Sequence, residues 1–148
     1  MSEQFNPNAW RRQKGINFPI LPLTEQAKRL RHFEKVINTT LIKAEKEFQK
    51  DLNAEYDIAG VILFGSWIRG DAYKQSDLDM YAIAYQNPHD LIWDFLNRLN
   101  KAKIGISVDC SDHILVTESH IVTSGEHKLI GNQYKIVTPY QSIKDVFS

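Results

Sequence analysis

Two short apolar runs, separated by a Gly-Ser turn and an Asp-x-Asp motif, constrain this chain more than any other feature. The first run, IAGVILF at 58–64, is rich in β-branched residues and too short for a helix, which favours a buried strand. Gly65 and Ser66 follow it directly, and ten residues later the second run, DLDMYAIA, begins at Asp77. The pattern predicts two strands with a sharp turn and a pair of carboxylates between them.

The two carboxylates, Asp77 and Asp79, form a like-charged pair that folding alone does not explain. Side chains at i and i+2 of a strand point to the same face, so both acids share one face and Leu78 and Met80 share the other. At about 5 Å, two like charges repel by roughly 3 kcal/mol at an effective dielectric near 20. The pair therefore indicates a bound cation.

A third acid is expected from KIGISVDCSDHILVT, at 103–117, which the pattern predicts to be a longer strand. Its core side is expected to carry Ile104, Ile106, Val108 and Cys110. Asp109 then lies on the open face with Asp77 and Asp79 if the second and third strands are adjacent, while Asp112 falls on the core side and is the weaker candidate. Three carboxylates on one face predict a site for Mg²⁺. Two such ions, about 4 Å apart, would align a triphosphate for in-line attack.

The Gly-Ser turn supplies the complementary phosphate site. Gly65 allows a sharp turn and a close approach of the backbone to a ligand. Ser66 stands where a short helix begins, so its hydroxyl and the backbone N–H groups there suit phosphate oxygens. Arg69 and Lys74 are candidates for added positive charge, or for pairing with a nearby acid.

The remaining elements complete an α/β (α+β) fold, a small mixed sheet with helices packed on one face. A long amphipathic helix is expected from an N-cap at Thr24 to about Asn53, with an apolar stripe of Ala27, Leu30, Phe33, Ile37, Leu41, Ala44 and Phe48. A second helix follows Pro88, a short helix is expected at 118–124, and a short strand at 133–137. Residues 1–23 are expected to form an N-terminal arm, and 24–148 a single domain.

Composition excludes several classes of function. The formal net charge is zero, with 18 basic and 18 acidic residues, which argues against a nucleic-acid partner. Cys110 is the single cysteine, so no internal disulfide and no cysteine-rich zinc site can form. No apolar segment approaches the roughly 18 residues of a membrane span, and the polar start is unlike a signal peptide. A cytoplasmic protein without a membrane partner is expected.

The motif GSWIRG…SDLDM resembles the signature of the nucleotidyltransferase superfamily with the polymerase-beta-like fold, and in particular its small branch, the minimal nucleotidyltransferases. The resemblance covers about 58–112. It implies that Ser66 holds nucleotide phosphates, that Asp77 and Asp79 bind magnesium, and that Asp109 binds metal and helps to deprotonate the acceptor hydroxyl. It also implies a nucleoside triphosphate substrate, with ATP the first choice, and transfer of AMP. Members of this branch often pair with a helical toxin-like ribonuclease, and some transfer AMP to a tyrosine of that partner.

Two other functions stay open at the level of sequence. One is nucleotidyl transfer to a small molecule of the aminoglycoside type, although nothing in the chain matches a large acceptor-binding domain. The other is a non-catalytic antitoxin that masks a partner protein. The three acids favour catalysis, because a protein that only binds has no need of them.

Overall fold

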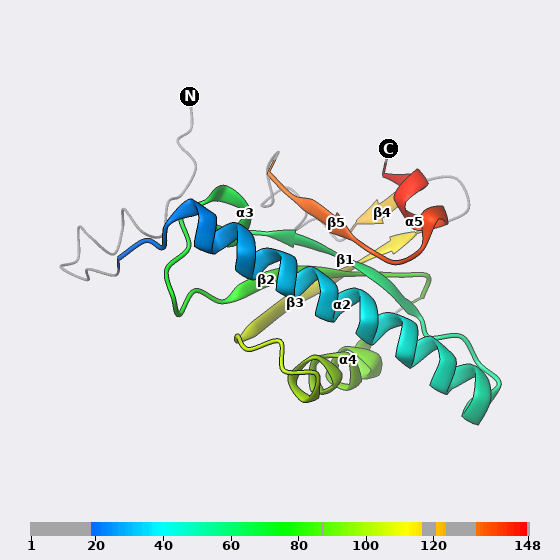
Figure 1. Cartoon of the computed structure of the whole chain (residues 1–148). Helices are drawn as coiled ribbons and strands as arrows, with labels where there is room; N and C mark the ends of the chain where they lie inside the picture. Colours follow the sequence, from blue (N-terminus) through cyan, green and yellow to red (C-terminus); the bar gives the residue numbers. More distant parts are fainter. Residues whose placement is uncertain (1–18, 87, 117–120, 124–132, 148) are drawn as a thin grey trace.

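A five-stranded mixed sheet forms the centre of the structure, a computed structural model that describes residues 19–86, 88–116, 121–123 and 133–147 (Figure 1). The strand order is β4-β3-β2-β1-β5. The strands are β1 (Ile58–Phe64), β2 (Leu78–Ala84), β3 (Val108–Val116), β4 (Ile121–Thr123) and β5 (Lys135–Val137). Of the paired strands, β2 and β3 are parallel and the others antiparallel, which confirms the predicted mixed sheet.

Two long helices, α2 (Leu23–Leu52) and α4 (His89–Lys101), cover one face of this sheet, as Figure 1 shows. We call this the helix face. Helix α4 connects β2 to β3, the crossover that a parallel pair requires. The core beneath the helices includes Phe33, Ile37 and Leu41 from α2, Phe95 and Leu99 from α4, and Leu78, Met80 and Ala82 from β2. The predicted packing of the long helices on one face is confirmed.

The start of α2 differs from the prediction. The helix begins at Leu23 after Pro22, not after an N-cap at Thr24. The fixed φ of proline suits this position, and the Pro22 carbonyl accepts a hydrogen bond from Gln26 N (3.0 Å). Gln26 is buried and Ala27 is exposed, so the inner face of the first turn carries a polar side chain that sequence periodicity does not predict. The helix ends as expected, with Asn53 in the left-handed conformation.

The other face of the sheet carries a second, smaller core, and we call it the site face. Ile143 of the short helix α5 (Gln141–Val146) packs there with Ile62, Tyr81, Ile83 and Ile114. The Phe64 and Tyr81 rings stack with their centroids 4.9 Å apart. Helix α5 was not predicted from the sequence. It covers part of the face on which the acids were expected, so only the rest of that face is open.

Strand β3 is shorter and less regular than predicted. It begins at Val108, because Lys103 and Gly105 have positive φ (59° and 79°) and interrupt extended backbone before that point. A register shift after Cys110 pairs Asp112 with Tyr81, so the single alternation assumed for the strand is wrong beyond Cys110. The Asp112 side chain lies outside the described residues.

The segment after β3 is the clearest error of local prediction. Ile121–Thr123 form strand β4, antiparallel to β3, where a helix was expected over 118–124; the flanking residues of that helix lie outside the described part. All three residues are β-branched, so their local preference also favours a strand, and the predicted helix was wrong over these positions. The predicted strand at 133–137 is confirmed as β5. Within the residues that the structure describes, no helix combines the length and apolar character needed to cross a membrane.

Candidate active site

The turn between β1 and the short helix α3 (Ser66–Arg69) brings backbone and carboxylate together. Gly65 has φ +82° and ψ −157°, a conformation that is essentially restricted to glycine. A Cβ built on Gly65 would overlap Asp79 Oδ2 and lie 3.2 Å from Asp79 Cγ. The glycine is therefore needed twice, for its φ and for the room that it leaves to the carboxylate. Ser66 follows directly and is partly exposed.

The parallel pairing of β2 and β3 sets the acids side by side. Asp79 is paired with Asp109, and Phe64 at the end of β1 is paired with Asp79 from the other side. The adjacency on which the third acid depended is thus confirmed. Asp79 is half-buried, whereas Asp77 and Asp109 are exposed.

The electrostatics of Asp79 reflect this crowding. Burial, together with the like charges of Asp109 and Asp77, raises the pKa of Asp79 to about 6, and the Arg69 guanidinium opposes the rise. Asp77 and Asp109 therefore both act electrostatically on Asp79 at one end of β2. Such a cluster, with one partly desolvated member, is characteristic of functional sites.

Two residues that sequence analysis missed connect the Gly-Ser turn to the acids. Trp67 is buried, and its Nε1 donates a hydrogen bond to the Ser76 carbonyl (3.0 Å). The Ser76 hydroxyl in turn accepts from Tyr73 N (2.9 Å). Because Ser76 directly precedes Asp77, this bond fixes the entry to β2 against α3. An Nε1 donor that has to be satisfied inside the core was the only available signal.

Gln26 of α2 is a third residue of this kind. Its side-chain amide donates to the Leu21 carbonyl (2.7 Å) and to the Gly70 carbonyl (3.1 Å), and its oxygen accepts from Ala72 N (3.2 Å). It thereby ties the start of the domain to the loop between α3 and β2. Ile20 also forms an isolated bridge with Tyr73 of that loop.

The two basic residues predicted for the site, Arg69 and Lys74, differ in their distance from the acids and in their ion pairs. Arg69 ends α3, close enough to act on Asp79, and forms an ion pair with Asp71 (Nε–Oδ1, 3.5 Å). Lys74 is exposed in the turn that leads to Ser76, and among the described residues no ion pair joins it to the acids. The structure therefore brings Gly65, Ser66, Arg69, Asp77, Asp79 and Asp109 to one region, with Lys74 at its edge.

The donor chemistry of this region fits a hard divalent cation. Carboxylate oxygens are the ligands that Mg²⁺ prefers, and the three acids carry mutually repelling charge that a cation would neutralise. Among the described residues, however, no three His, Cys, Asp or Glu side chains stand close enough to hold a metal ion already. The acids converge without completing a coordination sphere, so side-chain adjustment would accompany binding.

Comparison with known proteins places the chain in a family. The family model described as Polymerase beta, Nucleotidyltransferase matches residues 27–130, more than half of the 148-residue chain. The chain belongs to the polymerase beta nucleotidyltransferase family. The matched range contains the Gly-Ser turn, Arg69, Lys74 and the three acids, and it excludes Gln26, β5 and α5.

Comparison with individual proteins adds little to the family assignment. No curated protein matches this nucleotidyltransferase chain. Among solved structures, it is similar to spectinomycin adenyltransferase AAD(9) from Enterococcus faecialis with ATP and spectinomycin, at 15% sequence identity and a TM-score of 0.32. That match covers 76% of this chain and 48% of the other, so the chain spans about half the length of that enzyme.

Proposed function

We propose that this chain transfers a nucleoside monophosphate, AMP first among the candidates, from a nucleoside triphosphate to a hydroxyl group. The observation that carries the proposal is the pairing of Asp79 with Asp109 on adjacent parallel strands, with the Gly65 backbone against the Asp79 carboxylate. Membership of the nucleotidyltransferase family supports the reaction class.

Each residue of the site has a role in this proposal. Asp77, Asp79 and Asp109 would hold Mg²⁺, two ions in the full arrangement. When bound, the metal neutralises triphosphate charge and favours in-line displacement of pyrophosphate. The Ser66 hydroxyl donates a hydrogen bond to a phosphate oxygen, and Arg69 adds positive charge nearby. Asp109 is exposed beside Asp79, where its carboxylate accepts the proton of the acceptor hydroxyl.

The acceptor divides the finer hypotheses. Our prediction for the acceptor stays a tyrosine of a helical toxin-like partner, within a cytoplasmic toxin–antitoxin pair. An aminoglycoside-type acceptor is the alternative for a small molecule, and masking of a partner without turnover is the alternative without catalysis.

A transfer assay tests the proposal. The chain is incubated with Mg²⁺ and ATP labelled at the α-phosphate, in separate reactions with a tyrosine-containing peptide, an aminoglycoside or no acceptor. We expect labelled product and pyrophosphate from wild type in one acceptor reaction. Asp109→Asn should lose product by at least about a hundredfold while still binding ATP. Asp112→Asn should keep most activity, because Asp112 pairs with Tyr81 beyond the register shift and not with Asp79.

Two outcomes would count against this assignment. Retained nucleotide binding without transfer to any acceptor would favour a non-catalytic binding protein. Loss of transfer in Asp112→Asn with full activity in Asp109→Asn would make Asp112 the third acid, on the shifted part of β3.

A further inference from the structure

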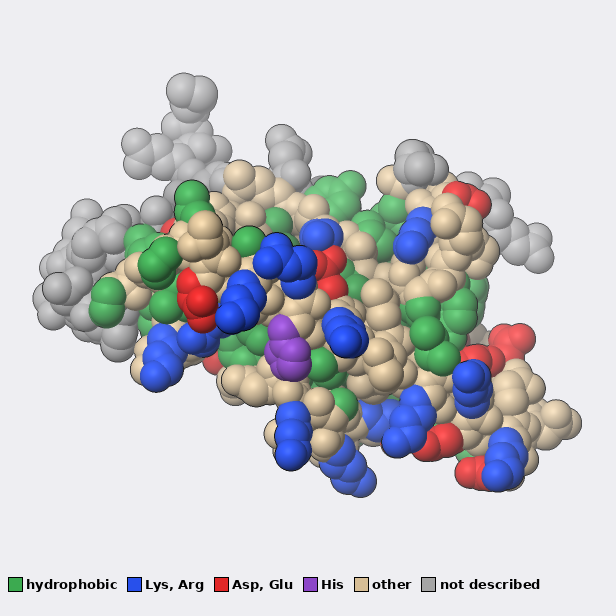
Figure 2. Space-filling view, in the orientation of Figure 1, with side chains coloured by type: hydrophobic (Ala, Val, Ile, Leu, Met, Phe, Trp, Pro, Cys, Tyr) green, Lys and Arg blue, Asp and Glu red, His purple; other side chains and the backbone are tan. Residues whose placement is uncertain are grey.

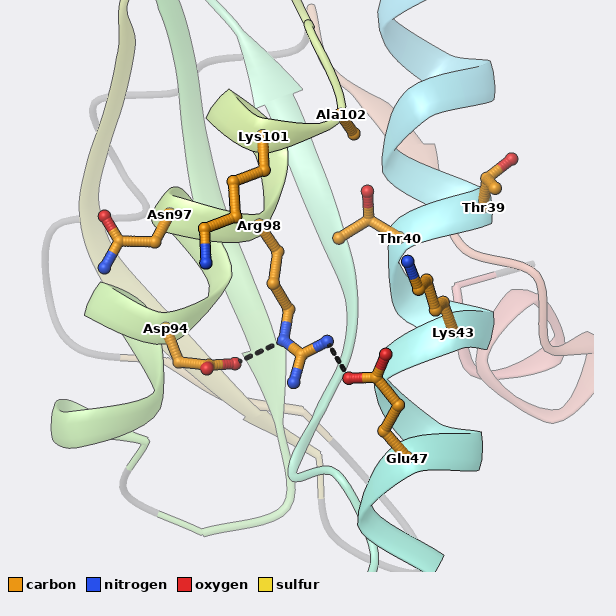
Figure 3. A pocket seen from close by; sticks show the side chains of 9 residues that line it. All are labelled: Thr39, Thr40, Lys43, Glu47, Asp94, Asn97, Arg98, Lys101 and Ala102. Atoms are coloured by element: carbon orange, nitrogen blue, oxygen red, sulfur yellow. Dashed lines mark hydrogen bonds and ion pairs between the residues drawn. The ribbon is translucent and has the colours of Figure 1, made fainter. Parts of the chain in front are cut away.

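A cavity of about 510 Å³ lies between α2 and α4, on the helix face and therefore across the sheet from the acids (Figure 3). Small-molecule sites commonly occupy about 300–1,000 Å³. The lining residues are Thr39, Thr40, Lys43 and Glu47 of α2, Asp94, Asn97, Arg98 and Lys101 of α4, and Ala102. None of them belongs to the proposed catalytic site.

Thr40 is the first indication of a ligand here. It is 5% exposed, lines the cavity, and its Oγ1 has no hydrogen-bond partner. The other buried polar residues of the described part, Gln26, Ser76 and Thr138, each form side-chain hydrogen bonds, although Asn38 Oδ1 on the same helix is also buried without one. A buried hydroxyl without a partner costs folding free energy. In Figure 3, Thr40 projects from α2 toward α4, into the gap.

The charges around the cavity give the second indication. Arg98 is already engaged, with Glu47 (Nη1–Oε2, 2.6 Å) and with Asp94 (Nε–Oδ2, 2.7 Å). Lys43 and Lys101 also line the cavity, and neither forms an ion pair within the described part of the chain. Lys and Arg side chains gather over α2 and α4 on this side of the molecule, as Figure 2 shows.

The Arg98 bridge makes the cavity a preformed one. It links α4 to α2 through Glu47, and its guanidinium also lies over the Phe48 and Tyr56 rings (5.9 and 5.7 Å from the centroids). These contacts hold the two helices at a set separation. A ligand therefore does not have to separate the two helices, and a rotation of the Thr40 side chain would bring its shielded hydroxyl to the ligand.

We infer that this cavity between α2 and α4 binds a small anion through a phosphate or carboxylate group. The Thr40 hydroxyl donates a hydrogen bond to the anionic oxygen, and the Lys43 and Lys101 ammonium groups neutralise its charge. The site is separate from nucleotidyl transfer in position and in chemistry, because it needs no metal.

Titration of the metal-free full-length chain with sodium phosphate or sodium succinate, followed by ¹H–¹⁵N NMR in EDTA, tests the inference. Sodium chloride at matched ionic strength is the reference. We expect saturable shifts of the Thr40, Lys43 and Lys101 amides with at least one of the two anions, and the anion that binds more tightly identifies the preferred group. Lys43→Gln with Lys101→Gln should weaken binding by about tenfold or more, and Thr40→Val by about threefold to tenfold.

Lys46→Gln is the matched control, because Lys46 is exposed on the same helix and does not line the cavity. It should bind as wild type does. Circular dichroism checks that each variant is folded. If Thr40→Val does not fold, the double-lysine variant still tests the inference, because both lysines are exposed. Any of four results would overturn the inference. They are the absence of saturable shifts with both anions, identical shifts with chloride, wild-type affinity of the double-lysine variant, and shifts centred on Ser66.

Discussion

Gly65 is the residue at which backbone conformation and site chemistry meet most closely. Its φ of +82° sets the turn after β1, and its missing side chain leaves room for the Asp79 carboxylate. Asp79 is in turn half-buried, next to two other acids. The position of the Asp79 carboxylate depends on the missing side chain of Gly65, so a substitution at either residue tests the geometry of the site.

Gly65→Ala should lower the free energy of unfolding by about 2 kcal/mol or more, because backbone strain of about 1–3 kcal/mol adds to overlap with the carboxylate. Transfer should fall below detection as Asp79 is displaced. Gly105→Ala is the matched control, since Gly105 also has positive φ (79°) but a Cβ there would lie 3.8 Å from Lys103 O, an ordinary contact. Chemical denaturation and the transfer assay measure both effects. Equal activity of the two variants would contradict the close approach.

Asp79 should make stability depend on pH. Its pKa is about 6 in the folded chain and about 3.9 when unfolded, so the folded chain binds more protons between these values. Stability therefore falls as pH rises from about 4 to 6 and stays lower above this window. Asp79→Asn should gain about 1–2 kcal/mol at pH 7.5 in EDTA, a value reduced for partial exposure, and little at pH 3.5. Denaturant titration at both pH values measures this; a variant less stable than wild type at pH 7.5 would refute it.

At the scale of elements, one hydrogen bond ties helix α3 to the entry of β2. Trp67 Nε1 donates to the Ser76 carbonyl across nine positions of sequence, inside the core. The Trp67 ring also meets Phe33 of α2 edge-on, with centroids 5.1 Å apart. Three segments therefore share contacts with this side chain, and the Gly-Ser turn is held relative to the acids.

Trp67→Phe should keep much of the ring packing and lose the hydrogen bond. We expect the free energy of unfolding to fall by about 1–2 kcal/mol, because the Ser76 carbonyl loses its donor in a buried position, and kcat to fall more than KM changes. Trp93→Phe is the control, since Trp93 is 73% exposed on α4 and should tolerate the change. Equal effects of both substitutions on kcat would argue against the positioning role.

The sequence predicted some of these elements better than others, because some depend on local pattern and others on contacts between distant segments. Strand β1 and helix α4 were predicted well because local pattern and burial coincide there. The register shift of β3 depends on pairing with β2, which no local pattern records. Strand β4, in contrast, carries the β-branched run Ile-Val-Thr, a local signal that the prediction of a helix did not use. Gly65, Ser66, Asp77 and Asp79 follow from short motifs, and Asp109 follows from strand alternation. Gln26 and Ser76, in contrast, act through contacts between distant segments.

At the scale of the whole molecule, the formal net charge is zero, but charge is not evenly spread. The acids Asp77, Asp79 and Asp109 lie together at one end of β2, whereas Lys and Arg side chains over α2 and α4 are mixed with acidic ones (Figure 2). A triphosphate is repelled by the acids and needs a cation to bind there. Nucleotide affinity is therefore expected to depend on metal.

Calorimetric titration with a non-hydrolysable ATP analogue tests this central claim most directly. Wild type should bind the analogue in Mg²⁺ and lose at least about tenfold in affinity in EDTA, since metal neutralises the charge between phosphates and acids. Asp77→Asn with Asp79→Asn should remove the difference between the two titrations while leaving the fold intact. Equal affinity of wild type with and without Mg²⁺ would contradict the account.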